Sequence, residues 1–429
     1  MSYLGIWCQS LLLAISVASV ANADNASSRV AQPSRSPEEQ RYLVEHGRYL
    51  ATIGACAACH TAPDVTPAPP ASTDTAGIDI DRRFRTDPDW FRYLDPQGKN
   101  ALAGGVPFNL RFSGTSNGTV YSMNITPDPQ TGIEPCQLGK QPTATCWTED
   151  ELVEVIRTGR RKTGSTPASL YLFPPHSFYS NLAEEDARAL AVYLRSLTPI
   201  ANNALQQELG NRRLPADQQT PPAQPTARKI APRGRSLDRG FYLINSLVGC
   251  RECHSYQKFT AQGPVVQAFQ GGDPADPFLG VFRLGPDLPL RANEKGFAVF
   301  PYPGYAVMYS PNLTVFGLGG PLNQVSNDLL VRAIRQGIAP MPDPYGRPDP
   351  IAHIMLWQFY SSMTDDDAYS IAEYVKTLQY VPHSTSPRLL LFGDNWEAAF
   401  TKVFGSFNVM TGSPANMITA EDRKIFGKK

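Results

Sequence analysis

Two short segments in different halves of the chain carry the same arrangement of thiol and imidazole groups. Two cysteines flank a pair of other residues and a histidine follows directly, in Cys56, Cys59 and His60 and again in Cys250, Cys253 and His254. Thiols one helical turn apart can each bond a vinyl-derived carbon of the same porphyrin, and the adjacent imidazole then points at the iron. This Cys-x-x-Cys-His spacing is typical of covalent haem attachment. We therefore predict two covalently bound haem c groups, with His60 and His254 as iron ligands.

A Cys-x-x-Cys pair by itself would also suit a zinc site or a thiol redox pair. A structural zinc site normally takes four cysteine or histidine ligands, often from two such pairs. Here the two pairs lie in different halves of the chain, and each has its own histidine directly behind it. This separation favours two haem groups over one shared zinc ion.

The composition allows packed cores and does not indicate a nucleic-acid partner. The chain has 429 residues, of which 42% are hydrophobic and 18% are charged, a length and composition that suit two or three folded domains. The 39 basic residues balance the 39 acidic ones, so no net charge would attract nucleic acid. Proline is frequent, with 39 residues, which indicates long non-helical loops.

The first residues are typical of an export signal. The apolar run from Leu11 to Val20 is too short to span a bilayer, and Ala21-Asn22-Ala23 supplies a small-x-small cleavage pattern. We predict a signal peptide over 1–23, cleaved after Ala23, and a periplasmic protein without a transmembrane segment in its mature chain. No basic residue precedes the apolar run, so a disordered or hydrophobic N-terminus is the alternative. Peripheral association with a membrane through a partner stays open.

Two cysteines lie outside the motifs and outside the predicted signal peptide. Cys136 and Cys146 are ten positions apart in a stretch rich in Gln, Pro and Thr. A lone pair of cysteines in an exported protein favours a disulfide that closes a small loop. Two free surface thiols are the alternative.

Four segments of the first half recur in the same order in the second half, which indicates a duplicated domain. The paired segments are residues 46–50 and 239–243, 121–126 and 309–314, 149–159 and 327–337, and 184–197 and 365–378. The last pair begins with acidic residues and ends near basic ones, which suits a helix dipole. We predict a mainly α fold of two tandem domains with long loops, over 38–200 and 236–383.

The segments outside the repeats have a different character. Residues 201–235 are rich in Pro and Gln, and prolines forbid a continuous helix there, so we predict an extended linker. In the tail, 384–429, apolar residues recur at helical spacing behind Asp394, which can cap a helix. We expect a short amphipathic helix that packs on the chain's own domains. A partner-binding helix is the alternative.

With its motifs set among these repeats, the chain resembles the class I cytochrome c family. It is most similar to the multihaem cytochrome subunits of bacterial periplasmic dehydrogenases for alcohols, aldehydes and gluconate-type sugar acids, and the resemblance covers residues 38–200 and 236–382. It implies that an N-terminal helix with a glycine crosses the last helix of each domain. Gly47 with Tyr193, and Gly240 with Tyr374, match these crossings.

The resemblance also implies which residues hold the haem propionates. The family's Asn-Ile/Leu-Thr loop and a following Trp lie beside these groups. The matching residues are Asn124, Thr126 and Trp147 in the first half, and Asn312 and Thr314 in the second half. Val325 stands where the second Trp would be. Both loops also fit the N-glycosylation pattern, but their recurrence at matching places favours the propionate interpretation.

The second axial ligand of a carrier in this family is usually a methionine, whose soft thioether raises the potential of the iron. In the second half, Met355 precedes the final helix where the family places its ligand. We predict Met355 as this ligand. Met341 and Met308 are the rivals, and a methionine that only fills a gap in the core is the alternative for each.

The first half has no methionine at the corresponding place. Phe173 or Pro174 stands opposite Met355, depending on the alignment, and neither can bind iron. We predict His176 as the ligand, which would give a bis-histidine haem of lower potential. Met123, an open iron and a surface position for His176 remain alternatives. Electrons would then pass from the first haem to the second.

These features predict an electron-transfer protein with no catalytic residues of its own. It would carry electrons in the periplasm between a donor, such as a dehydrogenase, and a respiratory acceptor, and its partners would be redox proteins. The haems would do the electron chemistry, and the protein would bind and orient them. A dihaem peroxidase-like enzyme with an open first haem is the alternative.

Overall fold

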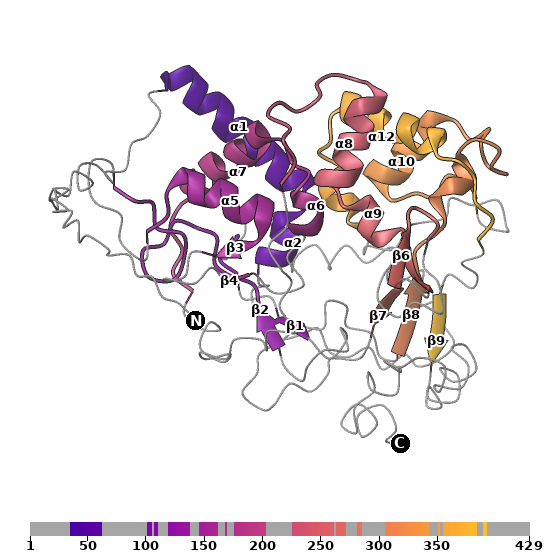
Figure 1. The fold of residues 1–429 in the computed structure, drawn as a ribbon, viewed down its shortest axis with the longest axis horizontal. Coiled ribbons are helices and arrows are strands. Elements are labelled where there is room, and N and C mark those ends of the chain that lie inside the picture. Colours follow the sequence, from indigo (N-terminus) through magenta and orange to yellow (C-terminus); the bar gives the residue numbers. More distant parts are fainter. Residues whose placement is uncertain are drawn as a thin grey trace, which may run out of the picture.

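The computed structural model describes fourteen stretches of the chain (Figure 1). These are residues 35–61, 101–104, 107–109, 119–137, 146–161, 168–169, 176–202, 225–260, 263–271, 281–284, 305–342, 351, 355–383 and 389–392. The predicted signal peptide and the predicted tail helix behind Asp394 lie outside these residues.

Helices dominate the described residues and occur in the same order in both halves, which confirms the prediction of a mainly α chain. The first half contains α1 (Pro37–Ile53), α2 (Cys56–His60), α5 (Glu149–Thr158), α6 (His176–Tyr179) and α7 (Glu184–Ser196). The second half contains α8 (Leu237–Ser246), α9 (Cys250–Cys253), the 3-10 helix η3 (Leu313–Phe316), α10 (Asn327–Gln336), α11 (Trp357–Tyr360) and α12 (Asp365–Thr377).

Local sequence signals explain where the longer helices begin and end. The Ser36 hydroxyl caps α1 by accepting from the Glu39 N–H, and Thr364 caps α12 in the same way. Thr148 and Glu151 form a reciprocal capping box at the start of α5. Helix α5 ends at Gly159 with a φ of 71°, in the left-handed region that glycine adopts without strain.

The first and last helices of each half cross at a glycine. A Cβ atom at Gly47 in α1 would lie 2.0 Å from the Ala189 carbonyl oxygen in α7, and 2.6 Å from the Tyr193 Cβ. In the second half, a Cβ at Gly240 would lie 2.0 Å from the Ser370 carbonyl oxygen. Only glycine allows the two backbones to come this close. Both predicted crossings are confirmed.

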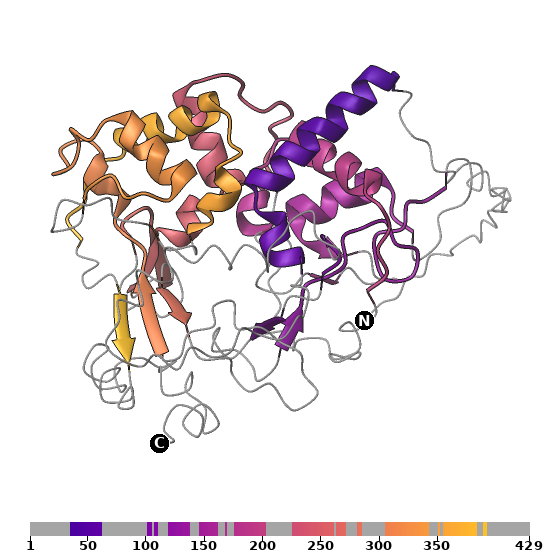
Figure 2. The ribbon, with the colours of Figure 1, turned by 180° about the vertical axis from the view of Figure 1, so that it is seen from behind.

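Short antiparallel strands lie beside the helices, on the side of α2 and α9 (Figure 2). They are β1 (Pro107–Asn109), β2 (Thr119–Tyr121), β3 (Arg160–Arg161), β4 (Ala168–Ser169), β5 (Tyr256–Thr260), β6 (Gly263–Gln267), β7 (Val281–Leu284), β8 (Tyr305–Tyr309) and β9 (Leu389–Phe392). Strands β7, β8 and β9 form one sheet, with β8 in the middle. Since β9 belongs to the predicted C-terminal tail, that part of the tail is attached to the second half.

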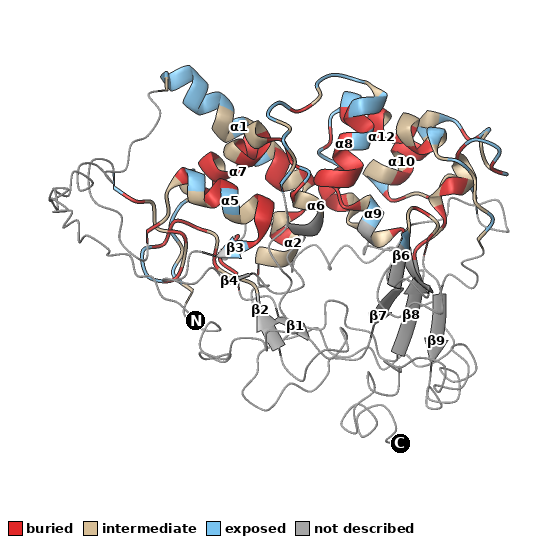
Figure 3. Cartoon of the chain, in the orientation of Figure 1, coloured by how far each residue is buried: buried red, intermediate tan, exposed pale blue. Residues whose placement is uncertain are grey.

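Most of the buried apolar side chains belong to one cluster that includes residues of both halves. Figure 3 shows buried residues on the helices of each half. Leu50 and Ile53 from α1 and Leu243 and Ile244 from α8 are all fully buried within the cluster. The contact between the halves is therefore part of the core. In the parts of the chain that the structure describes, no helix combines the length and the apolar character needed to cross a bilayer.

The second part of the predicted linker is extended, and it packs on the first half. Thr226 donates its N–H to the Ser180 carbonyl at 2.8 Å. The first N–H groups of α7, at Glu184 and Glu185, donate to carbonyls of the linker, each at 3.1 Å. These donors have no partner within their own helix. The linker thus completes the N-terminus of α7 and leads directly into α8.

Candidate functional site

Each Cys-x-x-Cys motif lies on a short helix that starts from a left-handed residue. Helix α2 follows Ala55, whose φ is 52°, and α9 follows Gly249, whose φ is 69°. The sharp turn separates each motif from the long helix before it. Because one helical turn separates the two cysteines of a motif, their side chains lie on the same face.

A backbone carbonyl fixes each motif histidine. The His60 Nδ1 lies 2.7 Å from the Met123 carbonyl oxygen, and the His254 Nδ1 lies 2.9 Å from the Pro311 carbonyl oxygen. Since a carbonyl can only accept, Nδ1 carries the proton and Nε2 keeps its lone pair for a metal. Burial lowers the pKa of both imidazoles, which favours the neutral form that a metal ligand requires.

The motif cysteines are half-buried thiols, and the raised pKa values of three of them do not suit redox exchange. Burial raises the pKa of Cys56 to about 12, of Cys59 to about 11 and of Cys250 to about 12. A thiol redox pair needs an accessible thiolate with a lowered pKa. Within the described stretches, no group of three or more His, Cys, Asp or Glu side chains could hold a metal ion. Two protonated thiols beside an imidazole with a free Nε2 fit a covalently attached haem c.

The Asn-x-Thr loops brace the carbonyls that hold these histidines. The Asn124 amide donates to the Ile200 carbonyl and the Thr131 hydroxyl at 2.7 and 2.9 Å, and its oxygen accepts from the Thr126 N–H and hydroxyl. Residue 123, whose carbonyl receives His60, directly precedes Asn124 in the chain. The side chains predicted to contact a propionate therefore tie the histidine-holding loop to the chain behind α7.

The same brace recurs in the second half. The Asn312 amide donates to the Val381 and His383 carbonyls at 3.0 and 3.2 Å, and its oxygen accepts from both Thr314 donors. Pro311, which holds His254, directly precedes Asn312. The propionate contacts stay a prediction, whereas the bracing role explains why Asn and Thr recur at matching places.

The disulfide prediction is confirmed, and it lies next to Trp147. Cys136 and Cys146 are joined, with their Cα atoms 4.7 Å apart. The backbones of Cys136 and Trp147 are hydrogen bonded to each other across the ends of this loop. Trp147 is half-buried against the core and precedes the capping residue of α5. Val325, its counterpart, is buried directly before the capping residue of α10.

In the second half, the three methionines considered as the second iron ligand have different surroundings. Met355 is half-buried two residues before α11 begins at Trp357. Met341 is 46% exposed, which suits a buried iron ligand less well. Met308 is part of β8, in a stretch whose side chains are not described. Met355 therefore stays the prediction for this ligand.

In the first half, the structure describes the candidates for the second iron ligand less completely. His176 is the first residue of α6, but its side chain is not among the described ones, and Phe173 and Pro174 lie outside the described residues. Met123 holds His60 through its backbone carbonyl and stays an alternative. His176 stays a prediction.

The two attachment segments lie close to each other, which the sequence did not indicate. A Cβ atom at Gly249, directly before Cys250, would lie 3.0 Å from the ring of Phe178 in the first half. A Cβ at Gly54, two residues before Cys56, would lie 2.9 Å from the Leu247 side chain. The N-terminal ends of both motifs thus meet where the two halves pack together.

Two tyrosines at matching positions hold the turns before the motifs. The Tyr179 hydroxyl donates to the Gly54 carbonyl at 3.3 Å, and the Tyr360 hydroxyl donates to the Val248 carbonyl at 2.9 Å. Burial, together with the neighbouring motif cysteines, raises the pKa of both phenols well above the ordinary value. Their recurrence in the repeated Phe-Tyr-Ser segments was the available sequence signal for this role.

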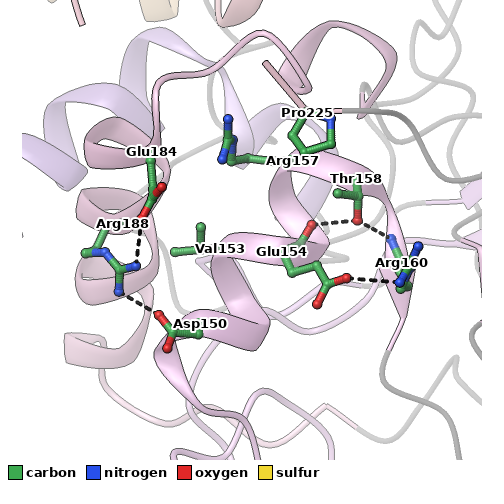
Figure 4. A pocket seen from close by; sticks show the side chains of 9 residues that line it. All are labelled: Asp150, Val153, Glu154, Arg157, Thr158, Arg160, Glu184, Arg188 and Pro225. Atoms are coloured by element: carbon green, nitrogen blue, oxygen red, sulfur yellow. Dashed lines mark hydrogen bonds and ion pairs between the residues drawn. The ribbon is translucent and has the colours of Figure 1, made fainter. Parts of the chain in front are cut away.

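A surface pocket lies apart from both motifs (Figure 4). It is lined by Asp150, Val153, Glu154, Arg157, Thr158, Arg160, Glu184, Arg188 and Pro225. Two ion pairs lie in it, Arg188 with Asp150 at 2.8 Å and Arg160 with Glu154 at 3.4 Å, and Arg157 donates to the Leu182 carbonyl at 3.1 Å. These pairs fix α5 and its neighbouring elements and do not single the pocket out as a cofactor site.

Comparison with models of known protein families finds no match. Comparison with curated proteins finds a cytochrome c subunit of a quinone-type alcohol dehydrogenase from Gluconacetobacter polyoxogenes, 28% identical over 366 residues, which are 82% of this chain and 59% of that protein. A gluconate 2-dehydrogenase cytochrome c subunit from Pantoea cypripedii is 27% identical over 230 residues, which are 51% of this chain and 40% of that protein.

A fructose dehydrogenase cytochrome subunit from Gluconobacter japonicus is also similar, at 24% identity over 232 residues, which are 51% of this chain and 36% of that protein. The chain thus spans less than two thirds of the length of these curated relatives. The identities are modest, but the names of the relatives agree with the motif geometry described above. The chain is therefore similar to the cytochrome c subunits of bacterial alcohol and gluconate dehydrogenases.

Proposed function

We propose that the chain is a dihaem c-type cytochrome that transfers electrons between redox proteins and catalyses no substrate reaction of its own. The observation that carries this proposal is the geometry of the two motifs. In each one, two half-buried thiols share a helical turn, and the histidine that follows keeps its Nε2 for a metal because a backbone carbonyl holds its Nδ1. The cytochrome c subunits among the relatives support the same conclusion.

A haem c, once bound, supplies reversible one-electron chemistry at its iron. The protein's part is to anchor and orient the group. Cys56 and Cys59 in the first half, and Cys250 and Cys253 in the second, are the thiols that anchor the two porphyrins. The carbonyls of Met123 and Pro311 keep each imidazole in one tautomer.

The two sites differ in the candidates for the second axial ligand. In the second half, the half-buried Met355 precedes α11, and a thioether favours ferrous iron. In the first half, the corresponding helix α6 begins at His176 instead. We propose a lower-potential first haem that passes electrons to a higher-potential second haem. A redox titration that resolves the two haems tests this order, and equal midpoint potentials would contradict it.

The donor we propose is a dehydrogenase, with a respiratory protein as the acceptor. The support is that the relatives are named as cytochrome c subunits of alcohol and gluconate dehydrogenases. A periplasmic location agrees with the Cys136–Cys146 disulfide, because disulfides persist in oxidising compartments. Sequencing the N-terminus of the protein from the periplasmic fraction checks the export step, and Asp24 is the expected first residue.

Haem content tests the function directly. The full-length protein, expressed with a cytochrome c maturation system, should bind two haem c groups per chain, as measured by the pyridine haemochrome spectrum. The Cys56→Ser/Cys59→Ser variant should keep only the second haem, and Cys250→Ser/Cys253→Ser only the first. A matched control, Cys136→Ser/Cys146→Ser, removes two cysteines but should keep both haems. A wild-type chain without covalent haem would overturn the proposal.

The visible spectrum separates an electron carrier from an enzyme. Two six-coordinate haems should give low-spin spectra in both oxidation states and should not bind carbon monoxide readily. A high-spin haem that binds carbon monoxide and reacts with peroxide would instead support the peroxidase-like alternative with an open first iron. The single-haem variants show which half is responsible.

A further inference from the structure

Two tyrosines reach from the first helix of one half to the last helix of the other half. The Tyr49 hydroxyl in α1 donates to the Asp367 Oδ2 in α12 at 2.5 Å and accepts from the Thr364 N–H at 3.2 Å. Burial, with a further contribution from Asp367, raises the pKa of Tyr49 to about 12. The phenol therefore remains a hydrogen-bond donor at neutral pH.

The second tyrosine makes the reciprocal contact. The Tyr242 hydroxyl in α8 donates to the Asp186 Oδ2 in α7 at 2.7 Å and accepts from the Ala183 N–H at 3.1 Å. Tyr242 and Tyr49 occupy matching positions in the repeat, and so do Asp186 and Asp367. Each tyrosine thus binds the first turn of the last helix in the other half, α12 or α7. It accepts from the N–H of the capping residue and donates to the aspartate three residues later.

A basic side chain of its own half also holds each aspartate. The His46 Nε2 lies 2.8 Å from the Asp186 Oδ1, and the Arg239 Nε donates to the Asp367 Oδ1 at 2.7 Å. Asp186 is fully buried and Asp367 is 4% exposed. Buried carboxylates require partners of this kind. We call these six side chains the reciprocal clasp: His46, Tyr49, Asp186, Arg239, Tyr242 and Asp367.

The reciprocal clasp lies on the same helices that lead into the two attachment motifs. Tyr49 lies in the last two turns of α1, shortly before the chain turns to Cys56. Tyr242 precedes Leu247, whose side chain lies 2.9 Å from the position of a Cβ at Gly54. The Asn181 amide adds a further bond between the halves, to the Asn245 carbonyl at 3.0 Å. Any rotation between the halves would break these contacts and separate the motifs.

We propose that Tyr49 and Tyr242 are positioning residues that hold the two haem-attachment segments in one fixed relation, so that electrons pass between the haems within one molecule. The inference rests on the proposed dihaem function and adds the residues that set the geometry between the haems. Neither tyrosine is an iron ligand or a catalytic residue. Their effect is exerted through the aspartates and the helix ends that they bind.

The test compares the wild-type holoprotein with the Tyr49→Phe/Tyr242→Phe double variant. The variant should fold, because Asp186 keeps His46 and Asp367 keeps Arg239. Pulsed electron paramagnetic resonance of the fully ferric protein measures the distribution of iron–iron distances. We expect one narrow distribution in the wild type and a broader one in the variant. Electron equilibration between the haems, followed after pulse radiolysis, should slow by about tenfold, since small displacements carry large rate penalties.

Tyr369→Phe is the matched control. It also removes a tyrosine–aspartate hydrogen bond on α12, from the Tyr369 hydroxyl to the Asp328 Oδ1 at 2.6 Å, but this bond lies within the second half. The control should leave both the distance distribution and the equilibration rate unchanged. A purely structural role for Tyr49 and Tyr242 would lower the melting temperature and leave the iron–iron distribution as narrow as before.

Haem content is measured first, so that a failure of the proposed dihaem function can be told apart from a failure of the proposed positioning role. A wild-type chain with fewer than two haems contradicts the proposed function. Two bound haems with an unchanged distance distribution in the double variant overturn the positioning role alone. Unchanged midpoint potentials in the double variant are expected, because the substitutions leave the iron ligands in place.

Discussion

At the scale of single residues, the main feature of each motif is the hydrogen bond from its histidine to a backbone carbonyl, which fixes the tautomer of the imidazole. His60 and His254 can be recognised from the sequence because they follow the cysteine pairs. Their partners, the carbonyls of Met123 and Pro311, are contributed by loops far along the chain. A carbonyl belongs to every residue, so no residue type identifies it. Asn124 and Asn312 could be singled out because they recur in matching segments, but their bonding partners could not.

Removing the amide of Asn312 should loosen the loop that holds His254. In Asn312→Ala, two carbonyls lose their donor and the Thr314 groups lose their acceptor, and each unsatisfied buried group costs about 1–3 kcal/mol. We expect the free energy of unfolding of the holoprotein to fall by about 2–4 kcal/mol, measured by denaturant titration. Asn323→Ala, at a half-buried asparagine in the turn before α10, is the control. A loss no larger than that of the control would contradict the bracing role.

At the scale of elements, the helix ends and crossings follow from local sequence. Serine and threonine caps, acidic first turns and the glycines at Gly159 and Gly337 all mark the ends that the structure shows. The crossing glycines could be predicted from the family resemblance. The antiparallel strands were not predicted, because each is short, and because β8 also pairs with β9, which lies far from it in the sequence.

The crossing glycine of the second half should not tolerate a side chain. Gly240→Ala places a Cβ 2.0 Å from the Ser370 carbonyl oxygen, so α8 and α12 must move apart. We expect the free energy of unfolding to fall by about 3 kcal/mol or more, as in overpacked cores. A lower melting temperature would show this loss. The comparison is Gly234→Ala, where nothing lies within 4 Å but φ is +65°, so only backbone strain of about 1–2 kcal/mol applies. Equal losses for the two variants would argue against the close crossing.

Glu149, at the start of α5, should give the protein an acid-sensitive connection to Arg35, which lies just before α1, and to α7. Burial alone would raise its pKa, but hydrogen bonds from Arg35 and Arg188 outweigh burial and lower the pKa below its ordinary value of 4.5. Folding therefore favours the charged carboxylate. The resulting stabilisation is fully present above pH 4.5 and is lost as the pH falls through the folded-state pKa.

The variant Glu149→Gln should reveal this dependence. At pH 7 it should unfold with about 1–3 kcal/mol less free energy than the wild type, because charged hydrogen bonds are lost. Its deficit should shrink below pH 4.5, where the wild-type carboxyl takes up a proton. Glu154→Gln, on the same helix but half exposed beside Arg160, should have little effect at any pH. A deficit that stays constant with pH would refute the role of the charge.

At the scale of the whole molecule, the two halves form one packed unit. Their buried residues belong to one cluster, and the reciprocal clasp closes the contact with polar bonds on both sides. This arrangement goes beyond two tandem domains joined by a linker. It brings the starts of the two motifs together, as electron exchange between the two proposed haems would require.

A core mutation at this contact should therefore destabilise both halves. Leu247 is 2% exposed and belongs to the second half, but it packs against Gly54 of the first half. Leu247→Ala should cost about 2–5 kcal/mol as a cavity in the core. Hydrogen exchange followed by mass spectrometry should show faster exchange in α1 and α7 as well as in α8 and α12. Faster exchange confined to the second half would mean that the halves unfold independently.

The sequence by itself determined the features that depend on residue type and local spacing. These are the two attachment motifs, the repeated helices with their caps, and the pairing of Cys136 with Cys146. The crossings at Gly47 and Gly240 followed from the resemblance to a family. Tertiary structure decided which carbonyl holds each histidine, what the Asn-x-Thr side chains bind, and how Tyr49 and Tyr242 cross between the halves. These depend on contacts between groups far apart in the chain, and they exist only once the helices have packed.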